Sequence, residues 1–157
     1  MDFPERIYTK EEVKLARELI EQGYKHDLQI DGSSEFIVKV GKAFDLIATA
    51  GYCDFVQTYI KTIKEISGLS QLREEDAAIW FHLKALDDPV DDAGFIIQKT
   101  QQMKDFIEGN LYYETAEIKA VNKRKEFVET LKNKTTDPEI KRKCEENLKR
   151  WSEQPFP

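Results

Sequence analysis

Residues 92–109 constrain the fold more than any other stretch of the sequence. Apolar residues recur there at the spacing of a helix that packs on one side and partly on a second: Phe95, Ile96, Met103, Phe106 and Ile107. The preceding Asp87-Asp88-Pro89 offers an Asp cap and a proline at the first helical position. Gly109 is a typical helix stop. We therefore expect a long helix around which the rest of the chain is organised.

Other helices are predicted on both sides of this stretch. Thr9 and Glu12 have the spacing of a capping box, and the helix that they begin is expected to end at Gly23. Apolar residues at helical spacing predict four more helices, over residues 35–50, 54–67, 114–132 and from 138 onward. The second of these four is expected to bury Val56, Tyr59, Ile60, Ile63 and Ile66.

Three short segments have the composition of strands rather than of helices. Residues 28–30 and 69–73 partly alternate between apolar and polar side chains, and residues 77–82 form a short aromatic and apolar run. We therefore predict an α+β fold: a helix-dominated single domain over residues 1–157 with a small two- or three-strand sheet. The ends, 1–8 and 152–157, are expected to be loosely ordered. Trp80 is expected to be buried, and Trp151 to hold the last helix against the domain.

Charge and cysteine content narrow the function classes. The net charge is -6 and basic residues are dispersed among acidic ones, which argues against a nucleic-acid partner. No stretch approaches the roughly 18 apolar residues of a membrane span, and the first residues do not resemble a signal peptide. Cys53 and Cys144 are far apart and are expected to be free thiols, which suits a reducing compartment. We therefore expect a cytoplasmic protein with no membrane partner.

Residues 69–131 carry a resemblance to a known family. A strand candidate, 78–81, comes before the 92–109 helix, in which Phe95-Ile96-Ile97 precedes Gln98-Lys99-x-x-Gln102. An E-x-x-A pattern, Glu117 to Ala120, follows. This order resembles the catalytic half of the HExxH zinc metallopeptidases, the zincins, in which the helix carries two His ligands and a Glu base. A later Glu is often the third ligand in that family. The resemblance therefore implies a zincin-like fold.

The residues that make zincins active are replaced in this chain. Gln98 and Gln102 stand at the two His positions, Lys99 stands at the position of the Glu base, and Glu117 keeps the chemistry of a third ligand. Neutral amide oxygens are poor zinc ligands, and a protonated lysine repels a cation and cannot take a proton from water. We therefore expect no bound metal, no cofactor, no catalytic residue and no peptidase activity.

Each candidate residue also has a structural interpretation. Gln98, Lys99 and Gln102 could form the exposed face of an amphipathic helix, or Lys99 could pair with Glu117 or Asp105 as a structural bridge. His82, Tyr112 and Tyr113 are candidates for lining a cleft beside the helix. A lone histidine such as His82 or His26 is more often structural or solvated than a ligand, and adjacent aromatic residues more often close a core edge.

The sequence therefore predicts a catalytically inactive, metallopeptidase-like domain. Its expected role is to bind a protein or peptide partner in the former substrate cleft. One alternative is an all-helical structural or interaction domain without zincin ancestry. Another is an enzyme of a different class that reuses the cleft, with Lys99 and Glu117 as its candidate residues. The arrangement of the sheet relative to the 92–109 helix, and the burial of Lys99, distinguish these alternatives.

Overall fold

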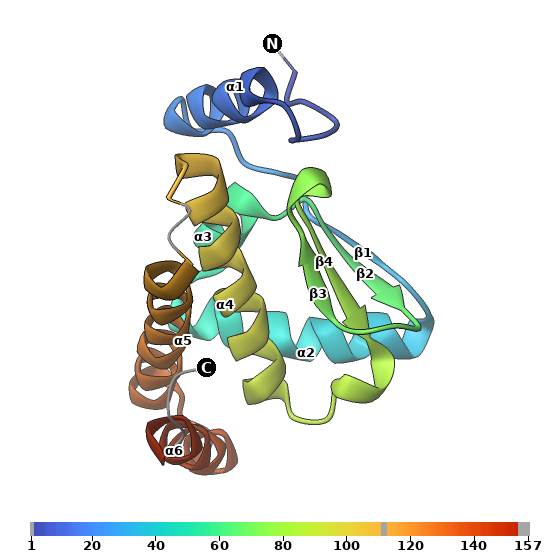
Figure 1. The fold of residues 1–157 in the computed structure, drawn as a ribbon. Helices are drawn as coiled ribbons and strands as arrows, with labels where there is room; N and C mark the ends of the chain where they lie inside the picture. The colour runs from blue at the N-terminus through green and yellow to red at the C-terminus, as the bar shows by residue number, and fades with distance from the viewer. Residues whose placement is uncertain (1, 111–112, 154–157) are drawn as a thin grey trace.

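The computed structural model describes residues 2–110 and 113–153, without the side chains of residues 113–115 and 153. This part of the chain is helix-dominated α+β, with six α-helices, four strands and two short 3₁₀ turns. The helices are α1 (Lys10–Glu21), α2 (Ser34–Ala50), α3 (Cys53–Tyr59), α4 (Pro89–Glu108), α5 (Tyr113–Lys134) and α6 (Pro138–Glu153). The strands are β1 (Gln29–Asp31), β2 (Thr62–Ile66), β3 (Gln71–Arg73) and β4 (Ala78–His82). Figure 1 shows the helices gathered on one side of the small twisted sheet.

The sheet is mixed, with strand order β1-β2-β4-β3. β1, β2 and β4 are parallel, with Ile30 opposite Ile63 and Ile63 opposite Ile79. β3 is antiparallel to β4, with Leu72 opposite Ile79, and forms one edge of the sheet. β3 follows β2 in the chain but is not its neighbour in the sheet. The β2–β3 connection therefore leaves room between the two strands, and β4 later occupies it. This edge is the one nearest to α4 (Figure 1).

The two faces of the sheet have different environments. Ile63, Ile79 and Phe81 point to one face, are at most 2% exposed and belong to the same core as α2 and α4. Trp80 points to the opposite face, where it is only half-buried and the Arg73 guanidinium lies 4.4 Å from its ring centroid. The prediction that Trp80 is buried was therefore wrong. Side chains alternate between the two faces along β4, so Ile79 and Phe81 point into the core and Trp80, which lies between them, points to the open face.

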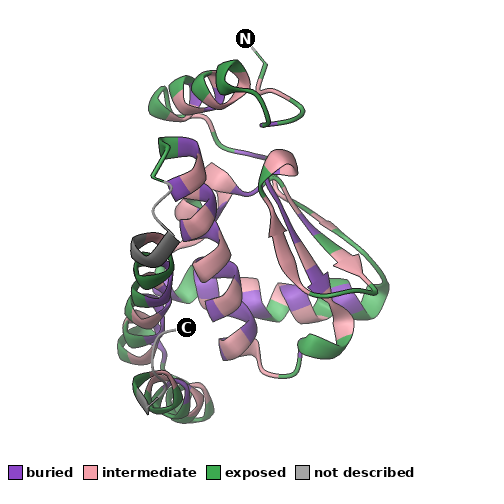
Figure 2. Cartoon of the chain, in the orientation of Figure 1, coloured by how far each residue is buried: buried purple, intermediate pink, exposed green. Residues whose placement is uncertain are grey.

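α4 is the central helix, as the sequence predicts. The Asp88 side chain accepts a hydrogen bond from the Val90 N–H, Pro89 follows the cap, and Gly109 ends the helix in the left-handed conformation at φ 79°. α4 contacts β3 and every other helix. Buried residues occur around most of its circumference (Figure 2), including the polar Asp92, Thr100, Gln101 and Asp105. A helix buried in this way must satisfy its polar side chains inside the protein.

Two expectations about the sheet were wrong. The helix expected from 54 to 67 ends at Tyr59, and residues 62–66 form β2, so the sheet has four strands instead of two or three. Ile60, Ile63 and Ile66 imitate helical spacing, but β-branched residues also favour a strand, and pairing with β1 and β4 on both sides decides the outcome. The sheet also excludes the all-helical alternative. Among the described residues, none of the helices combines the length and apolar character needed to cross a bilayer.

The N-terminal segment, expected to be loosely ordered, contacts the end of the sheet. Ile7 is 1% exposed, and its N–H donates to the Glu75 carbonyl at 2.7 Å. Arg6 forms an ion pair with the Glu75 carboxylate. At the other end of the chain, Ser152 belongs to α6 and residues 154–157 lie outside the described part.

Asp92 makes the stability of this fold depend on pH. It is 3% exposed on α4, and burial together with the negative charges of Asp91, Asp88 and Asp87 raises its pKa to about 8. The unfolded chain releases this proton near pH 4, so the native state holds an extra proton between about pH 4 and 8, and stability falls as the pH rises through that interval. Asp92→Asn removes this cost. We expect it to raise the free energy of unfolding by at least about 2 kcal/mol at about pH 8.5, with the gain vanishing toward pH 4.

Urea unfolding across this pH range tests the effect. Asp45→Asn, at an exposed position on α2, is the matched control and should change the free energy of unfolding by no more than about 0.5 kcal/mol at any pH. A gain from Asp92→Asn that is the same at both ends of the range would contradict burial of a protonated carboxyl.

Candidate functional site

One face of α4 looks toward β3 and the beginning of α5. Helical geometry places Gln98, Lys99, Gln102, Asp105 and Phe106 on it, because they follow one another at intervals of about one turn. Asp105 is buried and the other four are half-buried. Gln98, Lys99 and Gln102 therefore lie on one face of α4, and Asp105 extends the same row.

Two cavities lie between this face and the sheet edge. One has a volume of about 390 Å³ and the other of about 260 Å³. The described residues that line the larger cavity are Ile7, Tyr8, Gln71, Leu72, Arg73, Glu74, Glu75 and Phe106. Those that line the smaller one are Leu72, Glu74, Gln102, Asp105, Phe106, Asn110, Ala116 and Glu117. Since Leu72, Glu74 and Phe106 belong to both, the cavities adjoin, and together they are the β3–α4 groove.

The groove brings together some of the predicted site residues. Gln102 and Glu117 line the same cavity, and the negative charge of Glu117 acts on Lys99. Gln98 is turned away from the groove, because its side-chain oxygen accepts a hydrogen bond from Arg124 at 2.8 Å. Two of the four motif residues, Gln102 and Glu117, therefore line one end of the groove, whereas Lys99 and Gln98 are not among its described lining residues.

The aromatic and histidine candidates are placed differently. The His82 Nδ1 accepts a hydrogen bond from the Lys84 N–H, so this side chain caps the turn after β4 instead of lining the groove. His26 is 4% exposed and lies against the rings of Phe3 and Tyr24, and burial lowers its pKa to about 4. Tyr112 and the side chain of Tyr113 lie outside the described residues.

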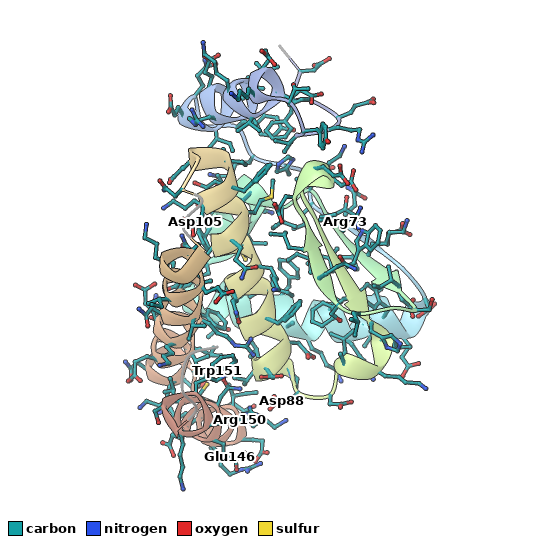
Figure 3. The ribbon with its side chains drawn as sticks, in the orientation of Figure 1. Arg73, Asp88, Asp105, Glu146, Arg150 and Trp151 are labelled. Carbon is teal, nitrogen blue, oxygen red and sulfur yellow. The ribbon has the colours of Figure 1, made fainter. Side chains whose placement is uncertain are left out.

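Arg124 is the polar residue on which this part of the fold depends. It projects from α5, is 5% exposed and forms an ion pair with Asp91 on α4 at 2.7 Å. Its guanidinium lies 4.5 Å from the ring centroid of Trp151 on α6. Arg124 therefore connects three helices, and Figure 3 shows Trp151 and Arg150 of α6 close to the start of α4, where Asp88 lies. Trp151 is half-buried in this contact.

A glycine makes room for this arginine. A Cβ added at Gly94 would lie 2.8 Å from the Arg124 Nε, so a larger residue would displace the guanidinium. Burial lowers the pKa of Arg124, and the opposing influence of Asp91 favours its charged form. In the sequence, the only signal for this role is the position of Arg124 in the apolar stripe of its helix.

Lys99 is engaged within its own helix. Its ammonium donates to the Gln102 side-chain oxygen at 3.2 Å and lies 5.2 Å from the ring centroid of Phe95. In the described part of the chain it forms no ion pair with Glu117 or Asp105, so the expected structural bridge is absent there. Burial, and next the positive charge of Arg124, lower the pKa of Lys99. Two cationic side chains thus bond to the two glutamines, Lys99 to Gln102 and Arg124 to Gln98.

Asp105 is a site residue whose role the sequence did not reveal. It is 4% exposed, and its Oδ1 accepts a hydrogen bond from the Gln101 Nε2 at 3.2 Å. Its Oδ2 is buried and has no hydrogen-bond partner within the described part of the protein. Burial raises the pKa of Asp105, and the hydrogen bond from Gln101 opposes that change. A buried carboxylate oxygen without a partner is costly, and Asp105 is one of the residues that line the smaller cavity.

No family model matches the chain, and no curated protein and no solved structure is significantly similar to it. The described residues also contain no group of three or more His, Cys, Asp or Glu side chains that could hold a metal ion. The chemistry of the β3–α4 groove is therefore the basis for assigning a function.

The connection made by Arg124 predicts a large loss of stability on its removal. Arg124→Ala leaves Asp91 with only its longer ion pair to Arg150, at 3.7 Å, and removes both the hydrogen bond to Gln98 and the cation beside the Trp151 ring, so the free energy of unfolding should fall by about 3 kcal/mol. Arg142→Ala is the matched control, since Arg142 pairs with Glu139 and Glu146 on the surface of α6 and is 54% exposed. It should cost less than about 1 kcal/mol. Equal costs in urea unfolding would contradict the central position of Arg124.

Proposed function

We propose that this protein is a zincin-like domain without a working metal site, and that it binds an extended peptide segment in the β3–α4 groove. The peptide adds to the free edge of β3 and places alternate side chains in the two cavities. The open edge of β3 carries the proposal, because it supplies unpaired backbone groups beside the two cavities of the groove.

The direction of the backbone groups supports this assignment. The His82 N–H points toward β3, where it donates to the Ser70 hydroxyl at 2.9 Å. Because alternate residues of a strand face opposite neighbours, Ile79 directs its backbone groups toward β2. Leu72 stands opposite Ile79 and therefore turns its own N–H and C=O away from β4, toward the open edge. In the described part of the chain no further strand pairs with β3.

The side chains of the groove suit a strand that carries alternating residues. Leu72 lies on the sheet face that points toward the helices, and Phe106 lies across from it on α4. A strand added beside β3 would direct every second side chain between them, since side chains alternate between the faces of a sheet. Backbone hydrogen bonds would give affinity, and the cavities would select side chains.

The zincin-like ancestry is supported by position and by what has replaced the ligands. The motif positions lie on the α4 face beside the sheet edge, and Glu117 approaches from α5. Lys99 and Arg124 bring two positive charges to the former ligand positions, which disfavours a metal cation. A cleft that keeps this position but disfavours a metal ion can bind a peptide without hydrolysing it.

The lowered pKa of Lys99 would also suit an amine in another class of enzyme. Two observations favour binding instead. Lys99 is not among the described residues that line either cavity of the groove, and its ammonium is held by Gln102 and by the Phe95 ring. An amine held in this way has no access to a substrate in the groove.

The proposed location is the cytoplasm, and the proposed partner is a protein or peptide with neither nucleic acid nor membrane involved. Cys53 and Cys144 are both free thiols, and Cys144 is fully buried in the core. Burial raises the pKa of each thiol, which favours the protonated, unreactive form. These properties support a compartment in which thiols stay reduced.

Strand addition predicts a pattern with a period of two along the ligand. Heptapeptides are selected from a random phage-display library on the wild-type protein, and each backbone N–H of a selected peptide is then methylated in turn. Methylation at every second residue should weaken binding about tenfold or more, as measured by fluorescence anisotropy. Each such methyl group removes a hydrogen bond to the β3 edge and clashes with that edge. Methylation of the residues between them should have little effect.

Protein variants locate the same site. Phe106→Ala removes a wall shared by both cavities and should weaken the selected peptides about tenfold. Ile37→Ala, at a 44% exposed position on α2, is the control and should leave binding unchanged. Failure to select any peptide, or a methylation pattern without a period of two, would overturn the proposed mode of binding.

The ancestry has a separate test in restoration of the ligands. A variant with Gln98→His, Lys99→Glu and Gln102→His should bind one zinc ion with a Kd below about 1 µM. Adding Glu117→Ala should weaken that binding at least about tenfold, since the carboxylate would be the third ligand. Calorimetric titration with zinc measures both. A restored variant that binds zinc no better than the parent, or that is indifferent to Glu117, would rule out the zincin geometry.

A further inference from the structure

One of the residues that line the smaller cavity of the β3–α4 groove carries an unsatisfied acceptor. Asp105 is 96% buried, since its exposed fraction is 4%, and its Oδ2 has no hydrogen-bond partner among the described residues. The same residue lines the cavity, and Figure 3 shows it near the C-terminal end of α4. A native protein keeps a buried, unpaired carboxylate oxygen at a cost, which a ligand that donates a hydrogen bond would relieve.

The rest of the cavity defines the charge of such a ligand. Glu74 and Glu117 are exposed and add two further carboxylates to its lining, whereas no lysine, arginine or histidine is among the described lining residues. In the described part of the chain, none of Glu74, Asp105 and Glu117 takes part in an ion pair within 4 Å. Three carboxylates around one cavity favour a cation there.

The cationic side chains nearest to the groove are already engaged. Lys99 donates to Gln102, Arg73 pairs with Glu75, and Arg17 donates twice to the Ile107 carbonyl. Lys104 and Lys119 act on Asp105 only through their charge at longer range. In the described part of the chain none of these five side chains forms an ion pair with Asp105 within 4 Å.

The shape of the lining distinguishes a side chain from a bare ion. Leu72, Phe106 and Ala116 give the cavity apolar walls, and the carboxylates lie beside them. A lysine or arginine side chain has the same division, with an apolar stem that packs on hydrophobic surface and a charged end that donates several hydrogen bonds. A metal ion would gain nothing from the apolar walls.

We propose that the smaller cavity receives a lysine or arginine side chain of the bound peptide, and that Asp105 is the residue that pairs with its charge. This inference rests on the proposed addition of a peptide strand to β3. Leu72 belongs both to the strand edge and to the cavity, so a residue paired beside it directs its side chain inward, toward Asp105. The partner is therefore an extended segment with a basic residue at an inward-facing position.

The test compares peptides that differ only at that residue. Peptides selected on the wild-type protein from the random library are sequenced, and any enriched lysine or arginine is replaced by norleucine, which keeps the stem and removes the charge. We expect enrichment at one position and a loss of affinity of about tenfold or more with norleucine, as is usual for a charge-assisted pair in a partly buried site. Fluorescence anisotropy measures each affinity.

The same peptides are measured with Asp105→Asn, which keeps the size of the side chain and an oxygen that can accept from Gln101. This variant should bind the lysine and norleucine peptides about equally, with the norleucine affinity unchanged. Asp45→Asn on α2 changes the net charge by the same amount and is the control for general attraction, so it should preserve the preference. Glu117→Gln, at an exposed lining position, should reduce the preference without abolishing it.

The outcomes separate the two proposals. Selection of no peptide overturns the proposed function and this inference with it. Selected peptides without an enriched basic residue, or an Asp105→Asn variant that keeps the full preference, overturn this inference alone and leave strand addition in place. A preference lost equally in Asp45→Asn would show attraction by net charge and would also overturn it. Zinc or magnesium that displaces the peptide from wild type and not from Asp105→Asn would identify a metal ion as the occupant instead.

Discussion

The burial of α4 is the constraint on which the rest of the structure depends. A helix that contacts β3 and all five other helices cannot leave its polar groups to water. In the N-terminal half of α4, Arg124 supplies polar partners to this helix, because it bonds to both Asp91 and Gln98. Its guanidinium also stacks on Trp151. The same contacts fix α5 relative to α4, and therefore fix the position of Glu117 beside the groove.

The elements that could be predicted are those whose signals are local. The capping box of α1 and the Asp cap, proline and terminal glycine of α4 are read directly from neighbouring residues. β2 could not be predicted in this way. Its isoleucines have a spacing that fits a helix, and only pairing with β1 and β4, which are distant in sequence, makes residues 62–66 a strand. Trp80 was misplaced for a related reason, since the choice of buried face belongs to the whole sheet.

The candidate site shows the same division. The row of Gln98, Lys99 and Gln102 on one helix face follows from helical periodicity alone. What these residues do depends on partners that periodicity cannot supply: Arg124 comes from α5, and the open edge comes from β3. Asp105 was visible as a polar residue in the same helix, but its unpaired oxygen is a property of the packed structure. A charged residue in an apolar stripe, such as Arg124, is the signal that sequence reasoning can use in other chains.

The charged side chains near the groove occupy different positions along the axis of α4. Lys99 and Asp105 are six residues apart, so their backbones are separated by about 9 Å along the axis of α4, and Gln102 lies between them. The ammonium of Lys99 is held at Gln102 and does not reach Asp105. The positive charge of Lys99 is therefore held away from the smaller cavity, which Asp105, Glu117 and Glu74 line with carboxylates. On the proposed strand addition, an extended ligand would have a preferred direction, because reversing it would move its basic residue away from Asp105.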